Sequence, residues 1–174
     1  MQAGLQPSTP LFFPGGERFE GNYLNPSTPL HGSMFYSNGD QYSGPFKNNQ
    51  RHGFGTYRYQ NTRELYEGDW QNDLWHGRGT YSVITGEVKI NGVWERGVLN
   101  GHTEVVHNNG DRFVGSFRNG VKDGDGEIFY GNGAYFKGKF SDDKPSGPAL
   151  FRYNPNTHYE GHFKNGLKHG SGNS

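Results

Sequence analysis

The side chains in this sequence most suited to catalysis or metal binding are its eight histidines. His158, Glu160 and His162 alternate along one segment, and residues two apart in a β-strand point to the same face. Two imidazoles and one carboxylate on one face resemble a zinc ligand set. Glu160 and His162, however, occupy the variable, solvent-side positions of a repeat described below. The pattern therefore favours an exposed polar stripe, and we predict no metal site.

The other candidate groups indicate structure rather than catalysis. His52, His76 and His169 recur at one fixed position before a glycine, where we expect them to satisfy the backbone of a turn. Glu67 and Asp69 form a carboxylate pair, but general acid and base catalysis needs a cleft that separates their environments. The chain contains no cysteine, no phosphate-binding glycine loop and no nucleophile elbow. We therefore predict no catalytic residue, no cofactor and no enzymatic activity.

Composition narrows the class of protein further. The 174 residues include 17 Lys and Arg against 17 Asp and Glu, so no net charge directs the chain to nucleic acid or to an anionic bilayer. The mean hydropathy of −0.96 would suggest disorder, yet aromatic residues make up 16% of the chain and glycine contributes 29 residues. That combination indicates a regular β architecture. With no signal peptide and no apolar membrane span, we expect a cytoplasmic protein.

A motif of the form aromatic-x-Gly-x-aromatic recurs at intervals of 23 or 24 residues. A further glycine follows nine residues later in six of the seven copies, and Asn-Gly turn sequences separate short alternating segments. This is the pattern of a repeated β-hairpin. We expect aromatic rings to lie flat over the neighbouring strand where glycines leave its backbone bare. The central glycines of the copies are Gly21, Gly44, Gly68, Gly92, Gly115, Gly138 and Gly161.

With Tyr66 to Gly79 and Tyr159 to Gly172 as its closest copies, the motif resembles the MORN repeat (membrane occupation and recognition nexus). The resemblance implies an all-β fold, an elongated single-layer array of antiparallel β-hairpins with two strands per repeat. We expect residues 1–12 to form an N-terminal tail and residues 13–174 to form one continuous array of about seven repeats, the last one truncated. The segment 13–19 matches the end of a preceding repeat.

Two copies depart from the pattern. The first copy reaches Gly32 only eleven residues after Gly21, which suggests an insert at residues 25–30 that forms a surface loop or a contact arm. The fourth copy has Ile90 in place of the first aromatic residue and Thr103 in place of a glycine. We expect ordinary drift of an interior repeat there, with a hinge or a specialised binding position as the alternative.

We expect the aromatic side chains to serve first as the core, and some of them to line an exposed groove as well. Aromatic grooves suit helices and extended peptides because they offer a large contact area at low entropic cost. Trp75 lies off the recurring positions and is the best single candidate for a contact. The full set of partner-binding candidates is Tyr42, Phe46, Tyr66, Trp70, Trp75, Trp94, Phe113, Phe117, Tyr135 and Phe136.

The resulting functional prediction is a non-catalytic scaffold that binds a helical or extended segment of a protein partner, with self-association through the array ends as a further property. The MORN resemblance implies a cytoskeletal, ciliary or membrane-associated assembly. Two alternatives remain at this stage. One is a peripheral phospholipid-binding module, which the dispersed basic residues disfavour. The other is a regulatory array for an enzyme whose catalytic domain lies outside this segment. Nucleic-acid binding needs a positive groove, and the composition does not predict one.

Overall fold

The computed structural model describes residues 9–83 and 85–173. In this part of the chain all of the regular secondary structure is β-strand. The seventeen strands are divided between two compact units, Met1–Thr85 (unit 1) and Gly86–Ser174 (unit 2). This confirms the predicted all-β fold built from antiparallel hairpins. Within the described ranges, no helix is long and apolar enough to cross a bilayer.

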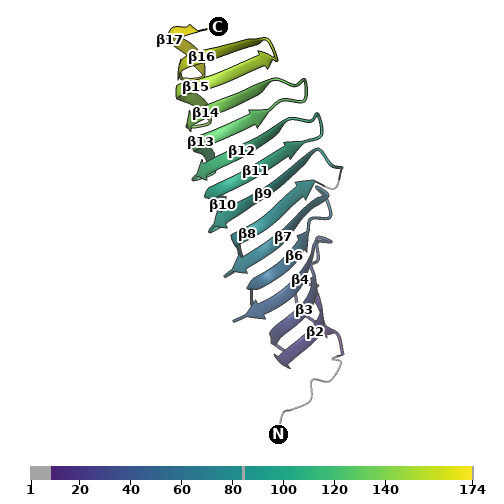
Figure 1. Cartoon of the computed structure of the whole chain (residues 1–174). Helices are drawn as coiled ribbons and strands as arrows, with labels where there is room; N and C mark the ends of the chain where they lie inside the picture. Colours follow the sequence, from purple (N-terminus) through teal and green to yellow (C-terminus); the bar gives the residue numbers. More distant parts are fainter. Residues whose placement is uncertain (1–8, 84, 174) are drawn as a thin grey trace. The chain divides into compact units, whose positions relative to one another are not determined.

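Unit 1 is an open antiparallel sheet in which strands pair with their neighbours in sequence (Figure 1). The short strand β5 continues the edge of the hairpin that β4 and β6 form. The strands of unit 1 are β1 (Leu11–Phe12), β2 (Arg18–Asn25), β3 (Thr28–Phe35), β4 (Gln41–Lys47), β5 (Gln50–Arg51), β6 (Gly53–Arg58), β7 (Glu64–Gln71) and β8 (Leu74–Val83).

Unit 2 has the same succession of antiparallel neighbours, and its short strand β10 pairs with β9 as β5 pairs with β4. Its strands are β9 (Val88–Glu95), β10 (Val98–Leu99), β11 (Gly101–His107), β12 (Arg112–Arg118), β13 (Val121–Phe129), β14 (Tyr135–Ser141), β15 (Lys144–Asn154), β16 (Thr157–Lys164) and β17 (Leu167–Asn173).

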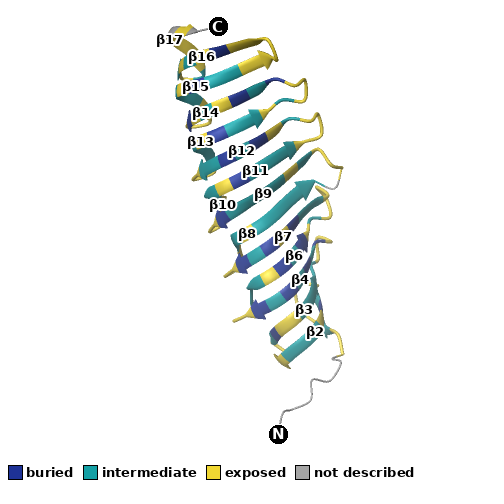
Figure 2. Cartoon of the chain, in the orientation of Figure 1, coloured by how far each residue is buried: buried dark blue, intermediate teal, exposed yellow. Residues whose placement is uncertain are grey.

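Buried and exposed residues alternate along the strands, and the alternation defines two faces of each sheet (Figure 2). In β7 of unit 1, Tyr66 and Trp70 are buried on one face and Glu67 is exposed on the other. In β12 of unit 2, Phe113 is buried and Arg112 is exposed in the same way. We call the side of Tyr66 and Phe113 the ring face, and the side of Glu67 and Arg112 the charged face.

The core of each sheet consists of aromatic rings that lie over pairs of glycines. Gly68 and Gly79 face each other across β7 and β8, and the fully buried ring of Tyr66 covers both. A Cβ atom at Gly79 would lie 2.7 Å from Cζ of Tyr66, so only glycine admits the ring this close to the backbone. The Tyr66 hydroxyl donates a hydrogen bond to the carbonyl of Asp69 at 3.0 Å. The predicted packing of rings over glycines is confirmed; Phe19, Tyr42, Phe113 and Tyr159 repeat it over glycine pairs, and Phe136 lies over the single glycine Gly138.

The fourth repeat shows how this packing adapts when the ring is absent. Ile90 replaces the aromatic residue, and Leu99 and the fully buried Thr103 lie against Gly92 in place of a ring. In the sixth repeat, Ala149 stands opposite Gly138 and is itself part of the buried cluster. In the fourth repeat both the ring and the opposite glycine are replaced, whereas in the sixth repeat the ring of Phe136 is kept beside Ala149.

The predicted insert at residues 25–30 is wrong. Gly21 pairs with Gly32 across β2 and β3, as Gly68 pairs with Gly79, and both pairs are eleven positions apart. Gly32 is therefore the glycine under the ring, and the first repeat merely lacks the glycine found nine positions after the centre in the others. In the other six repeats that glycine has a positive φ, between +62° and +134°. Residues 25–30 comprise the last residue of β2, a two-residue turn at 26–27 and the first residues of β3.

The segment 13–19 forms the same turn that links later repeats. The N–H of Phe13 donates to the carbonyl of Glu17, as the N–H of Tyr36 donates to the carbonyl of Asp40, both at 2.9 Å. The segment 13–19 therefore has the same turn hydrogen bond as the end of a complete repeat. Residues 11–12, placed in the tail by sequence, form β1 and pair with β2.

Tight two-residue turns close the hairpins within the repeats. Asn119 and Gly120 both have positive φ, +49° and +83°, and Asn165 and Gly166 follow the same pattern. Positive φ at both central residues is the mark of a type I′ turn, whose twist matches that of the flanking strands. The Asn-Gly hairpin turns predicted within the repeats are confirmed.

The turn of the fourth repeat carries a residue that should cost stability. Arg96 has a φ of +51°, a conformation that asparagine tolerates better than a longer side chain does. We expect Arg96→Asn to raise the free energy of unfolding by about 0.5 kcal/mol. Urea denaturation followed by circular dichroism measures the change. Arg78→Asn, at an exposed strand position, is the control, and an unchanged or lowered midpoint for Arg96→Asn would contradict the prediction.

Several hairpin turns are also tied to the turn of the preceding repeat in the same unit. The Asp73 carboxylate accepts a hydrogen bond from the N–H of Arg51 at 2.9 Å, and the Asp73 N–H donates to the Arg51 carbonyl at 3.1 Å. Asp143 and Lys122 form the same reciprocal pair, at 2.8 and 3.0 Å. Because such bonds link adjacent repeats, the stability of each unit depends in part on contacts between neighbouring repeats.

Candidate functional site

The ten aromatic residues proposed as partner contacts divide into two groups by exposure. Trp75, Phe117 and Tyr135 keep part of their surface open to solvent. Tyr135 lies on the charged face, opposite to its neighbour Phe136, and donates a hydrogen bond to Glu127 at 2.8 Å. The remaining seven are at most 8% exposed and pack within the protein, which leaves little surface for a partner; they are Tyr42, Phe46, Tyr66, Trp70, Trp94, Phe113 and Phe136.

Trp75 occupies a defined place on the ring face. It pairs with Trp70 across β7 and β8, and its indole stacks on Tyr66 with ring centroids 4.2 Å apart and an interplanar angle of 4°. The indole also contacts Tyr81, and it is hydrogen-bonded to Tyr59. Trp75 thus covers the ring that lies over the glycine pair, and its partly exposed outer surface forms part of the ring face of unit 1.

Three further tyrosines contribute exposed surface to the ring face of unit 1, and the sequence analysis assigned them no role. Tyr36, Tyr59 and Tyr81 are each half-buried. Burial raises the pKa of Tyr36 and Tyr59, and burial together with a hydrogen bond to Glu64 raises the pKa of Tyr81 to about 12. These phenols therefore stay protonated at neutral pH and keep the ability to donate hydrogen bonds. Tyr36 and Tyr59 share one position in the repeat and Tyr81 shares that of Tyr57, and this recurrence was the available signal.

A depression of about 370 Å³ opens on the ring face of unit 1. It exists because Met34 faces Phe19 at the position where Tyr57 faces Tyr42, so a narrow side chain replaces a ring. Its walls are formed by Phe13, Pro29, Met34, Tyr36 and Phe46, and its polar groups belong to Glu17, Ser27, Asn49, Arg51 and Asp73.

Arg51 supplies the fixed charge at the edge of this depression. Its guanidinium lies over the rings of Tyr57 and Trp70, 5.0 and 4.5 Å from their centroids. Its Nε donates a hydrogen bond to the Asp73 carboxylate at 2.9 Å, and the same contact is an ion pair between Arg51 and Asp73. Because rings and carboxylate hold the guanidinium on two sides, this wall is preorganised, and Asp73 balances its charge.

A buried carboxylate supports the rings beside the depression. Asp40 is 8% exposed and accepts hydrogen bonds from the Tyr57 hydroxyl, the Gln60 N–H and the Asn38 side-chain amide, all at 2.9 Å. Burial acts to raise the pKa of Asp40, but these hydrogen bonds outweigh it and hold the pKa below its ordinary value. Asp40 is therefore ionised at neutral pH and fixes Tyr57 in place.

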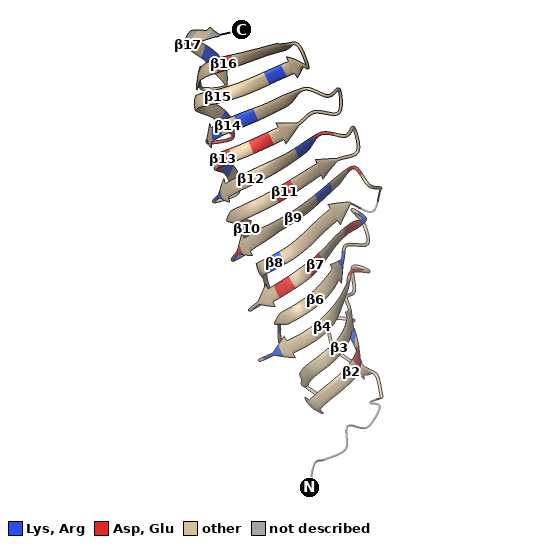
Figure 3. Cartoon of the chain, viewed as in Figure 1, with Lys and Arg blue, Asp and Glu red and all other residues tan. Residues whose placement is uncertain are grey.

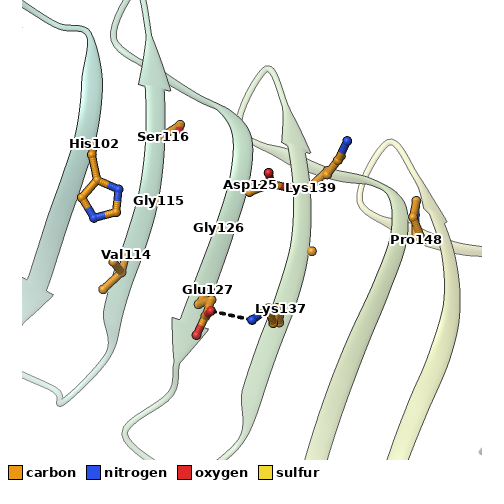
Figure 4. Close-up of a pocket in the computed structure, with 11 residues that line it drawn as sticks. His102, Val114, Gly115, Ser116, Asp125, Gly126, Glu127, Lys137, Lys139 and Pro148 are labelled. Carbon is orange, nitrogen blue, oxygen red and sulfur yellow. Dashed lines mark ion pairs between the residues drawn. The ribbon is translucent and has the colours of Figure 1, made fainter.

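The charged face of unit 2 is also hollowed, by a depression of about 480 Å³ (Figure 4). Within it, Glu127 and Lys137 point toward each other and form an ion pair at 3.0 Å. Hydrogen bonds from Lys137 and Tyr135 hold the pKa of Glu127 below its ordinary value. Basic and acidic residues alternate here and elsewhere on the sheets (Figure 3), so the depression presents no single sign of charge.

The histidines do not form the contacts expected of them. None of the three imidazoles of His52, His76 and His169 makes a hydrogen bond to any residue in the described ranges, and Nδ1 of His52 is buried without a partner there. The expectation that they satisfy a turn backbone is wrong for these side chains; at His52 it is the backbone N–H that bonds, to the Pro45 carbonyl at 3.1 Å.

His158, Glu160 and His162 lie exposed along one face of β16, as expected of a polar stripe. Within residues 9–83 and 85–173, no three His, Asp or Glu side chains lie close enough to hold a metal ion.

Comparison with known proteins places these features in context. The family described as MORN repeat matches residues 42–62, 66–86, 113–135, 136–157 and 159–173, together more than half of the chain. No curated protein sequence gives a significant match.

Among solved structures, the chain is similar to the TCP domain of Drosophila melanogaster SAS-4 (dCPAP) in complex with a proline-rich motif of Ana2 (dSTIL). The sequences are 16% identical, the match covers 93% of this chain and 86% of that one, and the TM-score is 0.48. A second structure, the TCP10c domain of Drosophila melanogaster Sas-4, has 18% identity, coverage of 88% and 85%, and a TM-score of 0.44.

Proposed function

The chain belongs to the MORN-repeat family, and on that premise we propose that it is a non-catalytic interaction module whose ring face in unit 1 binds a helical or extended segment of a partner protein. The family resemblance further suggests a cytoplasmic role in a cytoskeletal, ciliary or membrane-associated assembly. Regulation of an enzyme whose catalytic domain lies outside this segment is compatible with the same binding activity.

The depression beside Met34 is the observation that carries this proposal. The depression combines five apolar or aromatic residues with five polar or charged ones, and apolar walls with oriented polar groups are the usual form of a site for an anchoring side chain. Tyr36 and Tyr59 offer apolar surface together with hydroxyl donors, which suits a peptide backbone. We therefore propose that a large apolar side chain of the partner enters the depression while its backbone contacts the tyrosines.

The balance of charges supports a protein partner over a lipid bilayer. A peripheral lipid-binding surface needs clustered basic residues, each contributing roughly 1 kcal/mol near an anionic membrane. On the charged face of unit 2, Arg112 is paired with Glu104 and Lys137 with Glu127. In unit 1, Arg51 is paired with Asp73. These cations are thus already neutralised within the protein.

The proposal is tested by filling the depression. Met34→Tyr introduces the residue that occurs at the corresponding position of the next two repeats, Tyr57 and Tyr81, so the fold should tolerate it. Peptides are first selected against the wild-type chain from a random display library. We expect them to share a large apolar residue, and we expect Met34→Tyr to weaken their binding at least tenfold, about 1.4 kcal/mol.

Gln41→Tyr is the matched control, because it adds the same side chain on the charged face at the position that Tyr135 occupies in the sixth repeat. Circular dichroism confirms that both variants are folded. Equal binding by wild type and Met34→Tyr, or failure to select any peptide, would overturn the proposal.

A further inference from the structure

Two lysines of unit 2 place their ammonium groups over the aromatic rings of the ring face. Nζ of Lys122 lies 5.2 Å from the centroid of Phe113, and Nζ of Lys168 lies 4.3 Å from that of Tyr159. The Lys168 ammonium group also contacts the ring and the hydroxyl of Tyr153. Both cations are thus held against the ring face, whereas most charged side chains of these strands lie on the opposite side.

These lysines share one position in the repeat. Lys122 pairs with Phe117, and Lys168 pairs with Phe163, across the hairpin from the second aromatic residue. Arg51 has the same position in unit 1, where it pairs with Phe46. A cation above the rings is therefore a recurring element of the ring face.

The two units differ in how this cation is balanced. The carboxylate of Asp73 neutralises Arg51 in unit 1. In unit 2, neither lysine forms an ion pair with any residue that the structure describes. The Asp143 carboxylate is hydrogen-bonded to the backbone N–H of Lys122, not to its ammonium group. The ring face of unit 2 consequently presents two positive charges without internal counter-ions.

We propose that the ring face of unit 2 binds an acidic segment of a partner protein, with carboxylates placed on Lys122 and Lys168 and apolar side chains on the rings between them. This inference rests on the proposed function and specifies the chemistry of the partner. A carboxylate that binds such an ammonium group is stabilised by the ion pair, and the apolar rings around the ammonium group strengthen this attraction.

The spacing of the lysines sets the spacing of the acids. Lys122 is in β13 and Lys168 is in β17, four strand positions apart. At about 4.8 Å per strand, the two lysine positions are separated by about 19 Å. An extended segment covers this distance in about six residues and a helix in about thirteen. The partner should therefore carry two Asp or Glu residues at one of these separations.

The test uses fluorescein-labelled synthetic peptides with two glutamates at either separation among leucine, phenylalanine and serine, and matched peptides with glutamine in place of glutamate. Fluorescence anisotropy measures their affinity for the full chain. We expect at least one acidic peptide to bind more tightly than its glutamine counterpart and to weaken as salt increases. The double variant Lys122→Gln, Lys168→Gln should lose roughly tenfold in affinity for it.

Lys139→Gln with Lys164→Gln is the control, because it removes two exposed lysines from the charged face and changes the net charge equally. Equal affinity of acidic and glutamine peptides, or an equal loss in the control, would overturn the inference. If library-selected peptides still bind in a Met34-dependent manner, only this inference fails; if they do not, the proposed function fails as well. Binding of phosphatidylserine vesicles through the same lysines, without peptide binding, would also overturn it in favour of a lipid surface.

Discussion

Gly79→Thr is expected to lower the free energy of unfolding by about 3 kcal/mol, because any Cβ at this position meets the ring of Tyr66. The φ of Gly79 is not positive, so the loss reports the close approach of the ring and not backbone strain. Urea denaturation followed by circular dichroism and tryptophan fluorescence measures it. Ser82→Thr, on the charged face of the same strand, is the control and should change stability little.

The fourth repeat provides a rescue for this variant. There, Ile90 and Thr103 replace the ring and the glycine together, so Tyr66→Ile should restore part of the stability that Gly79→Thr loses. In a double-mutant cycle we expect a coupling free energy of about 2 kcal/mol between the two positions. Additive losses, or a fully stable Gly79→Thr protein, would show that the ring does not depend on the glycine.

Asp40→Ala is expected to destabilise unit 1 by about 3 kcal/mol, because it leaves the Tyr57 hydroxyl and the Gln60 N–H without their shared acceptor. Ala134 occupies the corresponding place in a turn of unit 2, so alanine itself fits the turn. Asn156→Ala, in an exposed turn, is the control. A loss no larger than that of the control would contradict the account of the Asp40 network.

The same carboxylate should make stability depend on pH. The folded pKa of Asp40 lies below its unfolded value of about 4, so its contribution is present above that pH and is lost as the pH falls through the folded pKa. Denaturation midpoints should therefore decline more steeply below about pH 4 in wild type than in Asp40→Ala. Parallel declines of the midpoint in both proteins would show that Asp40 does not cause the loss of stability at low pH.

The fold was predictable because one short motif is repeated. Alternation around Gly68 identified which residues share a face, and the close approach of Tyr66 explained why glycine recurs. The register of the first repeat was not predictable from glycine spacing alone. Gly32 could be aligned with either of two recurring glycines, and only strand pairing shows that it is the one beneath the ring of Phe19.

The candidate site was less predictable, since a period of two identifies a face but not how deeply a ring is buried. Tyr66 and Trp75 both lie on the ring face, yet Trp75 covers Tyr66 and removes it from solvent. Tyr135 is next to Phe136, so alternation alone should have placed it on the opposite face. The depression depends on the narrow side chain of Met34, whose significance appears only once its place among the rings is known.

The most direct test of the proposed binding face is nuclear magnetic resonance of isotope-labelled chain titrated with a library-selected peptide. We predict shifts of the Trp75 indole N–H and of backbone amides bordering the depression, such as those of Tyr36 and Arg51, while the amides of Thr56 and Glu67 on the charged face stay unchanged. Shifts confined to the charged face would contradict it.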